Sequence, residues 1–284
     1  MVYWTYLGMG EQESPTKDNT TNPDAEILEQ GDIYFFYRPK KAAEVKGIED
    51  VRRFFMVTAP EKENSNNNSQ LFRLFVIGKK SLPEVRKTEA RVSERYWARV
   101  GGIFKDANEL TKELSSDEFR RGDAARPVGE GKYAIVKHHQ KHTELAYILE
   151  MPKQPGEAQK ELGIEKEASY IISVINPRKP AASSVADGGK YPSTEEIPMY
   201  PEELLEEFGD DDTFVPLSRD TRFIDYQNAQ ILLTAAREGR DVIKSDIGIE
   251  IDQSHDSSQA DIFYKLKVRK DQVPIRPLTE GKLE

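Results

Sequence analysis

Three of the four histidines in this 284-residue chain stand between positions 138 and 142. They are His138, His139 and His142, and Glu144 follows two residues later. Imidazole and carboxylate groups are ligands that zinc and nickel accept, so His138, His142 and Glu144 are candidate metal ligands. The competing interpretation is a turn between two strands whose histidines face water. The strand-like sequences on both sides favour the turn, and on that basis we expect no bound cofactor.

A second group of candidate residues is basic or aromatic and flanks the apolar runs. Aromatic rings can stack on a base or an apolar partner, and nearby cations can attract phosphate. Aromatic residues within strands are nevertheless more typical of a core. If their side chains converge, the following residues would form a ligand or partner surface: Arg52, Arg53, Arg73, Lys79 and Trp97.

The sequence Gly-Glu-Gly-Lys at 129–132 is similar to a phosphate-binding loop. A Walker motif requires a glycine where Arg126 stands and a serine or threonine where Tyr133 stands. We therefore interpret this stretch as a tight turn that leads into a strand. No nucleophile elbow, zinc-protease or dinucleotide motif is present, so no catalytic residue is assigned. Asp225 fits either a catalytic carboxylate or a helix cap.

The elements that would position these side chains are mainly strands. Short runs rich in aromatic and β-branched residues, closed by Gly, Pro or Asn, predict seven strands before residue 176. Such close spacing indicates an α+β protein with a strand-rich antiparallel core, either a barrel or a sandwich. A helix is expected near 106–120, whereas 229–236 and 261–268 fit a strand or a helix. The residues expected to be buried on facing strands are Ile33, Phe35, Phe55, Val57, Leu74, Val76, Ile135, Tyr147, Leu149, Ile172 and Val174.

Changes in composition along the chain predict its organisation. Residues 1–29 form a polar lead-in, and 30–177 form the strand-rich core domain. A Pro-, Ser- and Gly-rich stretch at 178–200 indicates a linker or surface crossing. Residues 201–284 are then a C-terminal extension that packs on the core.

The overall composition excludes several classes of function. With no cysteine, the chain has no disulfide, thiolate nucleophile or cysteine-bound metal. A net charge of −9 disfavours nonspecific binding to nucleic acid, although a local basic patch would still permit it. No secretory signal and no apolar run of about 18 residues is present. We therefore expect a soluble, cytoplasmic protein without a membrane partner, and a protein partner or self-association through an aromatic sheet edge.

Three stretches resemble an uncharacterised conserved family of microbial proteins, and the similarity covers most of residues 30–236. They are GDIYFFYRP at 31–39, ARPVGEGKYAIV at 125–136 and HTELAY at 142–147. This resemblance implies no established activity and no catalytic residue. The stretch 31–37 is also similar to the Gly-Asp strand of PUA-like barrels, some of which read modified nucleotides. The leading hypothesis is a non-enzymatic binding or assembly module; a PUA-like nucleic-acid reader and a metal-dependent hydrolase at the histidines are the alternatives.

Overall fold

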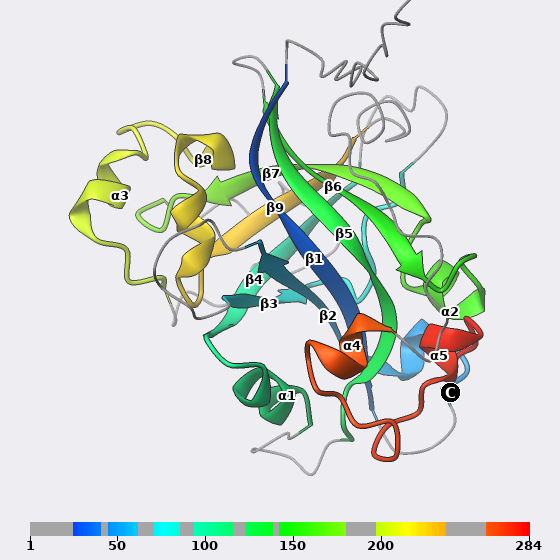
Figure 1. Ribbon diagram of the computed structural model, residues 1–284. Coiled ribbons are helices and arrows are strands. Elements are labelled where there is room, and N and C mark those ends of the chain that lie inside the picture. Colours follow the sequence, from blue (N-terminus) through cyan, green and yellow to red (C-terminus); the bar gives the residue numbers. More distant parts are fainter. Residues whose placement is uncertain are drawn as a thin grey trace, which may run out of the picture.

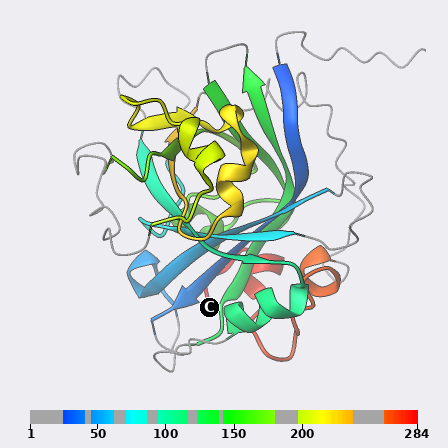
Figure 2. The ribbon, with the colours of Figure 1, turned by 90° about the vertical axis from the view of Figure 1, so that its left-hand side faces the viewer.

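The strands of this protein form one sheet that closes on itself. The computed structural model describes residues 25–40, 45–61, 71–85, 94–115, 123–138, 142–179, 197–236 and 260–284. Its nine strands pair in the order β6-β5-β1-β2-β3-β4-β9-β7-β8, and a further pairing of β6 with β7 joins the first eight into an antiparallel barrel (Figures 1 and 2). The expected antiparallel, strand-rich α+β core is confirmed, and it is a barrel.

In the part of the chain that the structure describes, seven strands precede residue 176, as expected from the apolar runs. The strands are β1 (Ala25–Pro39), β2 (Val51–Pro60), β3 (Phe72–Ile77), β4 (Arg95–Phe104), β5 (Arg126–His138), β6 (His142–Met151), β7 (Glu167–Ile175), β8 (Phe214–Pro216) and β9 (Gln230–Ala235). The helices are short: α1 (Ala107–Ser115), α2 (Glu157–Glu161), α3 (Glu202–Glu206), α4 (Asp261–Tyr264) and α5 (Arg276–Thr279), with 3-10 turns η1 (Ile48–Asp50), η2 (Leu217–Arg219) and η3 (Thr221–Asp225).

The barrel takes strands from outside the 30–177 segment. β1 begins at Ala25, within the predicted polar lead-in, and β9 comes from the segment predicted to pack on the core. β9 lies between β4 and β7 and hydrogen-bonds to both, so it belongs to the barrel wall. Residues 229–236 therefore contain a strand, whereas 261–268, the other ambiguous stretch, contains the short helix α4. Tertiary pairing decides such cases because a short apolar run suits both structures.

β1 and β2 are buried on both of their faces. Ile33 and Phe35 point into the barrel, while Tyr34 and Phe36 belong to a second apolar cluster on its outer side. Double burial explains why these strands read as continuous apolar runs rather than alternating ones. Every residue of the predicted core is buried except Val76, which is partly buried. However, the predicted core residues do not all face one another, because the outer cluster contains Phe55, Val57 and Leu74.

Each end of the barrel is covered by short elements. At the end where β1 starts, an aromatic cluster of Tyr200, Phe208 and Phe223 packs above the strands. At the opposite end, Tyr37 donates a hydrogen bond of 3.0 Å to the backbone oxygen of Glu284. In Figure 1 the first cover is the yellow region with α3 and β8, and the second lies near α2 and α5.

The Gly-Glu-Gly-Lys stretch lies in the middle of β5, so the predicted turn is wrong there. A Cβ on Gly131 would lie 2.0 Å from the backbone oxygen of Ile148, and one on Gly31 would lie 2.2 Å from that of Ala59. Glycine is needed at these two positions because neighbouring backbone approaches closely. The glycines of this stretch therefore serve close strand packing and not a turn.

Two predicted features lie outside the described residues. They are the hairpin turn at 139–141, which includes His139, and most of the predicted linker, 180–196. Among the described residues, no helix combines the length and apolar character needed to span a bilayer.

Candidate functional site

The β5–β6 hairpin places three predicted metal ligands side by side. His138 and His142 are register partners across the two strands, and Glu144 stands two residues along β6 from His142. Side chains two residues apart in a strand share a face. Because Leu145 and Tyr147 of β6 belong to the interior core, His142 and Glu144 point outward. The three side chains therefore lie on the outer surface of the barrel wall.

The ligand atoms of this cluster lie close together. One ligand atom from each of His138, His142 and Glu144 falls within 4.8 Å of the others. Nε2 of His142 is 2.7 Å from Oε1 of Glu144, and Nε2 of His138 is 3.7 Å from Oε2 of the same carboxylate. The two imidazole rings stack with a centroid distance of 5.2 Å.

The surroundings hold the carboxylate in place while leaving one imidazole nitrogen unused. The Ser169 hydroxyl, fully buried on β7, donates a short hydrogen bond to Oε2 of Glu144. The Glu144 side chain is only 9% exposed, whereas those of His138 and His142 are 19% and 32% exposed. Nε2 of His138 is buried and has no hydrogen-bond partner. A metal ion could accept the lone pair of that nitrogen.

The structure does not gather the five residues of the predicted partner surface. Arg73 points into the barrel and is only 3% exposed, so it is not part of any outer surface. Arg53 is exposed and Arg52 is partly exposed near the start of β2. Lys79 lies beyond β3, with its Nζ 4.5 Å from the centre of the Tyr96 ring.

Trp97 is buried on the outer side of β4. Its ring stacks on Phe214 with a centroid distance of 6.0 Å, and it shares a small apolar cluster with Ile175 and Leu232. The indole face is thus occupied by the chain itself. Among the described residues, each of the eight barrel strands pairs on both sides, whereas β8 pairs with β7 alone; self-association through a sheet edge stays a prediction.

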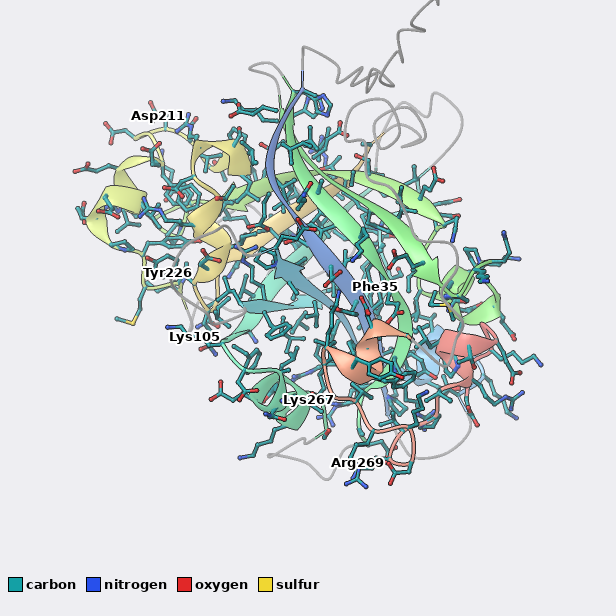
Figure 3. All side chains as sticks on the ribbon, viewed as in Figure 1. Phe35, Lys105, Asp211, Tyr226, Lys267 and Arg269 are labelled. Carbon is teal, nitrogen blue, oxygen red and sulfur yellow. The ribbon has the colours of Figure 1, made fainter. Side chains whose placement is uncertain are left out.

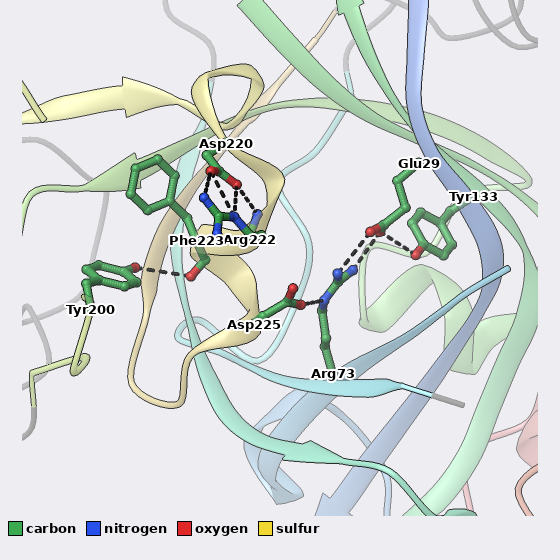
Figure 4. A network of polar contacts seen from close by, with 8 residues as sticks. All are labelled: Glu29, Arg73, Tyr133, Tyr200, Asp220, Arg222, Phe223 and Asp225. Carbon is green, nitrogen blue, oxygen red and sulfur yellow. Dashed lines mark hydrogen bonds and ion pairs between the residues drawn. The ribbon is translucent and has the colours of Figure 1, made fainter. Parts of the chain in front are cut away.

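Arg73 is the centre of a polar network inside the barrel that the sequence did not reveal (Figure 4). Its Nη1 and Nη2 donate to the two carboxylate oxygens of Glu29 at 2.6 and 2.9 Å, and its Nε donates to Asp225 at 2.6 Å. The Tyr133 hydroxyl donates to Glu29 at 2.7 Å. An arginine within the apolar run 71–77 was the available signal, because a buried guanidinium requires carboxylate partners.

The charges of this network depend on one another. Burial by itself lowers the pKa of Arg73, but the nearby Glu29 and Asp225 more than offset this and raise it overall. Burial also raises the pKa of Asp225, with Arg73 acting in the opposite direction. Tyr133 has its pKa raised well above the usual value by burial and by Glu29. These groups tie η3 to the barrel wall, so we assign the network a structural role.

The position of Asp225 excludes one of the two roles open to it from the sequence. It is the last residue of η3 and bonds to Arg73, whereas the cap of η3 is Asp220, whose carboxylate accepts from the Arg222 backbone N–H. Asp225 is therefore not a helix cap. Its carboxylate secures the cover of the barrel end.

Comparisons with known proteins add no relative: no family model, no curated protein and no solved structure matches this chain. By its fold the chain is a closed antiparallel barrel with a partial cover of short helices. Its described residues carry one cluster with the composition and spacing of a metal site.

Proposed function

We propose that this chain is a non-enzymatic binding module whose ligand is a divalent transition metal ion held by His138, His142 and Glu144. The observation that carries the proposal is the convergence of their three ligand atoms within 4.8 Å on one face of the β5–β6 hairpin. Nothing in the hairpin pairing alone requires two imidazoles and a carboxylate at neighbouring outward positions.

The ligand set favours some metals over others. Two imidazoles and one carboxylate suit zinc, nickel and cobalt, whereas magnesium and calcium prefer oxygen ligands throughout. Ligand atoms around a tetrahedral zinc ion are about 3.3 Å apart, given zinc–ligand distances of about 2.0–2.1 Å. The pairs of 2.7 and 3.7 Å in this cluster bracket that value. All three ligand atoms lie within 4.8 Å of one another, so binding the ion would require side-chain rotations that bring them closer.

Ser169 has the role expected of a residue behind a metal ligand. Carboxylates that bind metals are themselves hydrogen-bonded, which fixes their orientation. The buried Ser169 hydroxyl supplies this bond to Glu144. Loss of Ser169 should therefore weaken metal binding without removing a ligand.

The barrel interior supports a binding module rather than an enzyme with an internal chamber. Phe35 packs against Phe54 and Tyr147 with centroid distances of 6.1 and 5.2 Å, and these three residues are buried almost completely. Side chains thus fill the barrel, which makes it a rigid support for groups on its outer face.

The direct test is metal binding by chelator-treated protein without an affinity tag. Titration with Zn²⁺, Ni²⁺ or Co²⁺ by calorimetry, with elemental analysis after gel filtration, should give one equivalent bound. His138→Ala and Glu144→Gln should each weaken binding at least tenfold. Glu26→Gln is the matched control, because Glu26 is a carboxylate on the adjacent strand β1 that contacts Lys137 at 3.6 Å. Less than a tenth of an equivalent bound to the parent protein would contradict the proposal.

The second candidate is a metal-dependent hydrolase at the same cluster. It is favoured by the number of ligands, since three protein groups leave a position where a metal could activate water. Chromogenic esters and phosphodiesters distinguish the two candidates. A binding module leaves them intact, whereas a hydrolase cleaves them at a rate that requires metal and is lost in Glu144→Gln.

The other functional expectations stay predictions. A PUA-like nucleic-acid reader would need several cations on one surface. Arg52 and Arg53 are consecutive residues of β2, but Arg73 bonds to Glu29 inside the barrel and does not join them. Fluorescence anisotropy with labelled RNA would test that reading. The cytoplasmic location and a protein partner are likewise proposed from the sequence.

A further inference from the structure

Residues 260–284, here called the strap, cross the outer side of the barrel. In Figure 1 the strap is the orange and red segment that contains α4 and α5, in front of β1 and β5. Ile262 and Leu266 are fully buried in the outer apolar cluster together with Tyr34 and Phe36 of β1. The strap therefore covers an apolar face that would otherwise be in water.

Glu130 of β5 fixes the start of the strap. Its side chain lies beneath α4, and the residue is only 3% exposed. Oε1 accepts a hydrogen bond of 3.0 Å from the backbone N–H of Asp261, and Oε2 accepts one of 2.8 Å from that of Ile262. A buried carboxylate thus connects the barrel wall to the backbone of the strap.

The cations near Glu130 are committed to other carboxylates. Lys132, on the same strand, pairs with Asp32 of β1. Lys265 of the strap lies 2.7 Å from Asp32 and 2.6 Å from Asp261. Among the described residues, no lysine or arginine forms an ion pair with Glu130. Only the backbone N–H groups of Asp261 and Ile262 offset the cost of burying a negative charge on Glu130.

The remaining charged neighbours make that cost larger. Asp261 from α4 and Glu150 from β6 both repel a negative charge on Glu130, and Tyr34 from β1 offers only a hydroxyl. Burial is the main reason that the pKa of Glu130 rises to about 7, since the two amide hydrogen bonds offset it only in part. The group therefore titrates near neutral pH.

We propose that the strap is a pH-responsive cover, which docks tightly on the barrel when Glu130 carries a proton and loosens when Glu130 is ionised. The inference is independent of the proposed metal site. It places a reversible control on the exposure of the outer apolar face of β1 and β2.

The sign of the effect follows from the two states of the strap. With the strap docked, the pKa of Glu130 is about 7, and with the strap released it returns toward the ordinary value of 4.5. The docked state binds the proton more tightly, so docking strengthens as the pH falls through 7 and levels off near 4.5. Between pH 8 and pH 5.5 the docking equilibrium constant should rise about 25-fold.

Hydrogen–deuterium exchange of the full chain measures this equilibrium. Protection factors, which correct for the intrinsic pH dependence of exchange, should rise by roughly that factor in residues 260–268 between pH 8 and pH 5.5. Glu130→Gln has no titrating proton, so its protection should be independent of pH. The level should lie below that of the parent at pH 5.5, because the amide nitrogen cannot accept one of the two backbone N–H groups. Asp271→Asn is the matched control within the strap, because Asp271 contacts only the exposed Arg269 there; it should behave as the parent.

A second variant separates docking from titration. Lys265→Gln removes contacts to Asp32 and Asp261, so it should lower protection at both pH values while keeping the 25-fold response. Protection in the parent protein that is constant with pH, or that rises with pH, would overturn the proposal. So would a Glu130→Gln protein that retains the parent's pH response.

Discussion

Removal of the buried Arg73 guanidinium should damage the fold far more than removal of an equally well-bonded surface arginine. Arg73→Met keeps much of the side-chain volume but deletes the three hydrogen bonds to Glu29 and Asp225. The variant then holds two carboxylates at the barrel end without a cation. Such uncompensated buried charge costs about 3–5 kcal/mol. Asp225 keeps 30% exposure, and water there should hold the loss near the lower value.

Arg222→Met is the control for this measurement. Arg222 also contacts two carboxylates, that of Asp220 (Figure 4) and that of Glu203, but its own side chain is 55% exposed. Water replaces a surface ion pair at little cost, so this variant should lose little stability. Each arginine contacts two carboxylates, so a difference between the two variants reports the burial of the arginine and not the number of its contacts.

The assay is urea unfolding followed by circular dichroism at pH 7 and pH 5. In Arg73→Met the pKa of Asp225, already raised by burial, should rise further because the nearby positive charge is gone. A carboxyl with a raised pKa destabilises the folded state as the pH rises, so the deficit against the parent should shrink at pH 5. A loss below 1 kcal/mol at pH 7, or one equal to that of Arg222→Met, would refute the reasoning.

Two further substitutions test the packing. Phe35→Ala removes a fully buried ring (labelled in Figure 3) from its contacts with Phe54 and Tyr147 and should cost about 3–5 kcal/mol in urea unfolding. Tyr264→Ala, at an exposed position of α4, should cost under about 1 kcal/mol. Equal losses would mean that the barrel interior is not the main core. Gly131→Ala places a Cβ 2.0 Å from the Ile148 oxygen and should lower the melting temperature by several degrees, at about 2–4 °C per kcal/mol for a domain of about 150–250 residues. Gly47→Ala meets the flexible end of Glu49 and should change the melting temperature little. A Gly131→Ala protein as stable as the parent would show that β5 and β6 can separate without cost.

The strands and most of the core could be predicted because their signals are local. Runs such as 33–37 and 54–58 combine aromatic and β-branched residues between turn formers, and the chain can bury them only in a sheet. Their burial on both faces, which accounts for the lack of alternation, became clear only from the structure. The sequence also placed His138, His142 and Glu144 in one hairpin, where spacing by two residues sets their common face.

Only the tertiary structure decided how those strands close and which polar groups meet. Closure depends on the pairing of β6 with β7 and on the insertion of β9 between β4 and β7, and no local pattern encodes either contact. For the same reason Arg73 was grouped with surface cations, because Glu29 and Asp225 stand 44 and 152 residues away from it along the chain. Glu130 looked like part of a turn until the strap, 131 residues further on, supplied its amide donors. Residue type and spacing set which face a side chain takes on its own strand, but its partners depend on the chain's long-range closure.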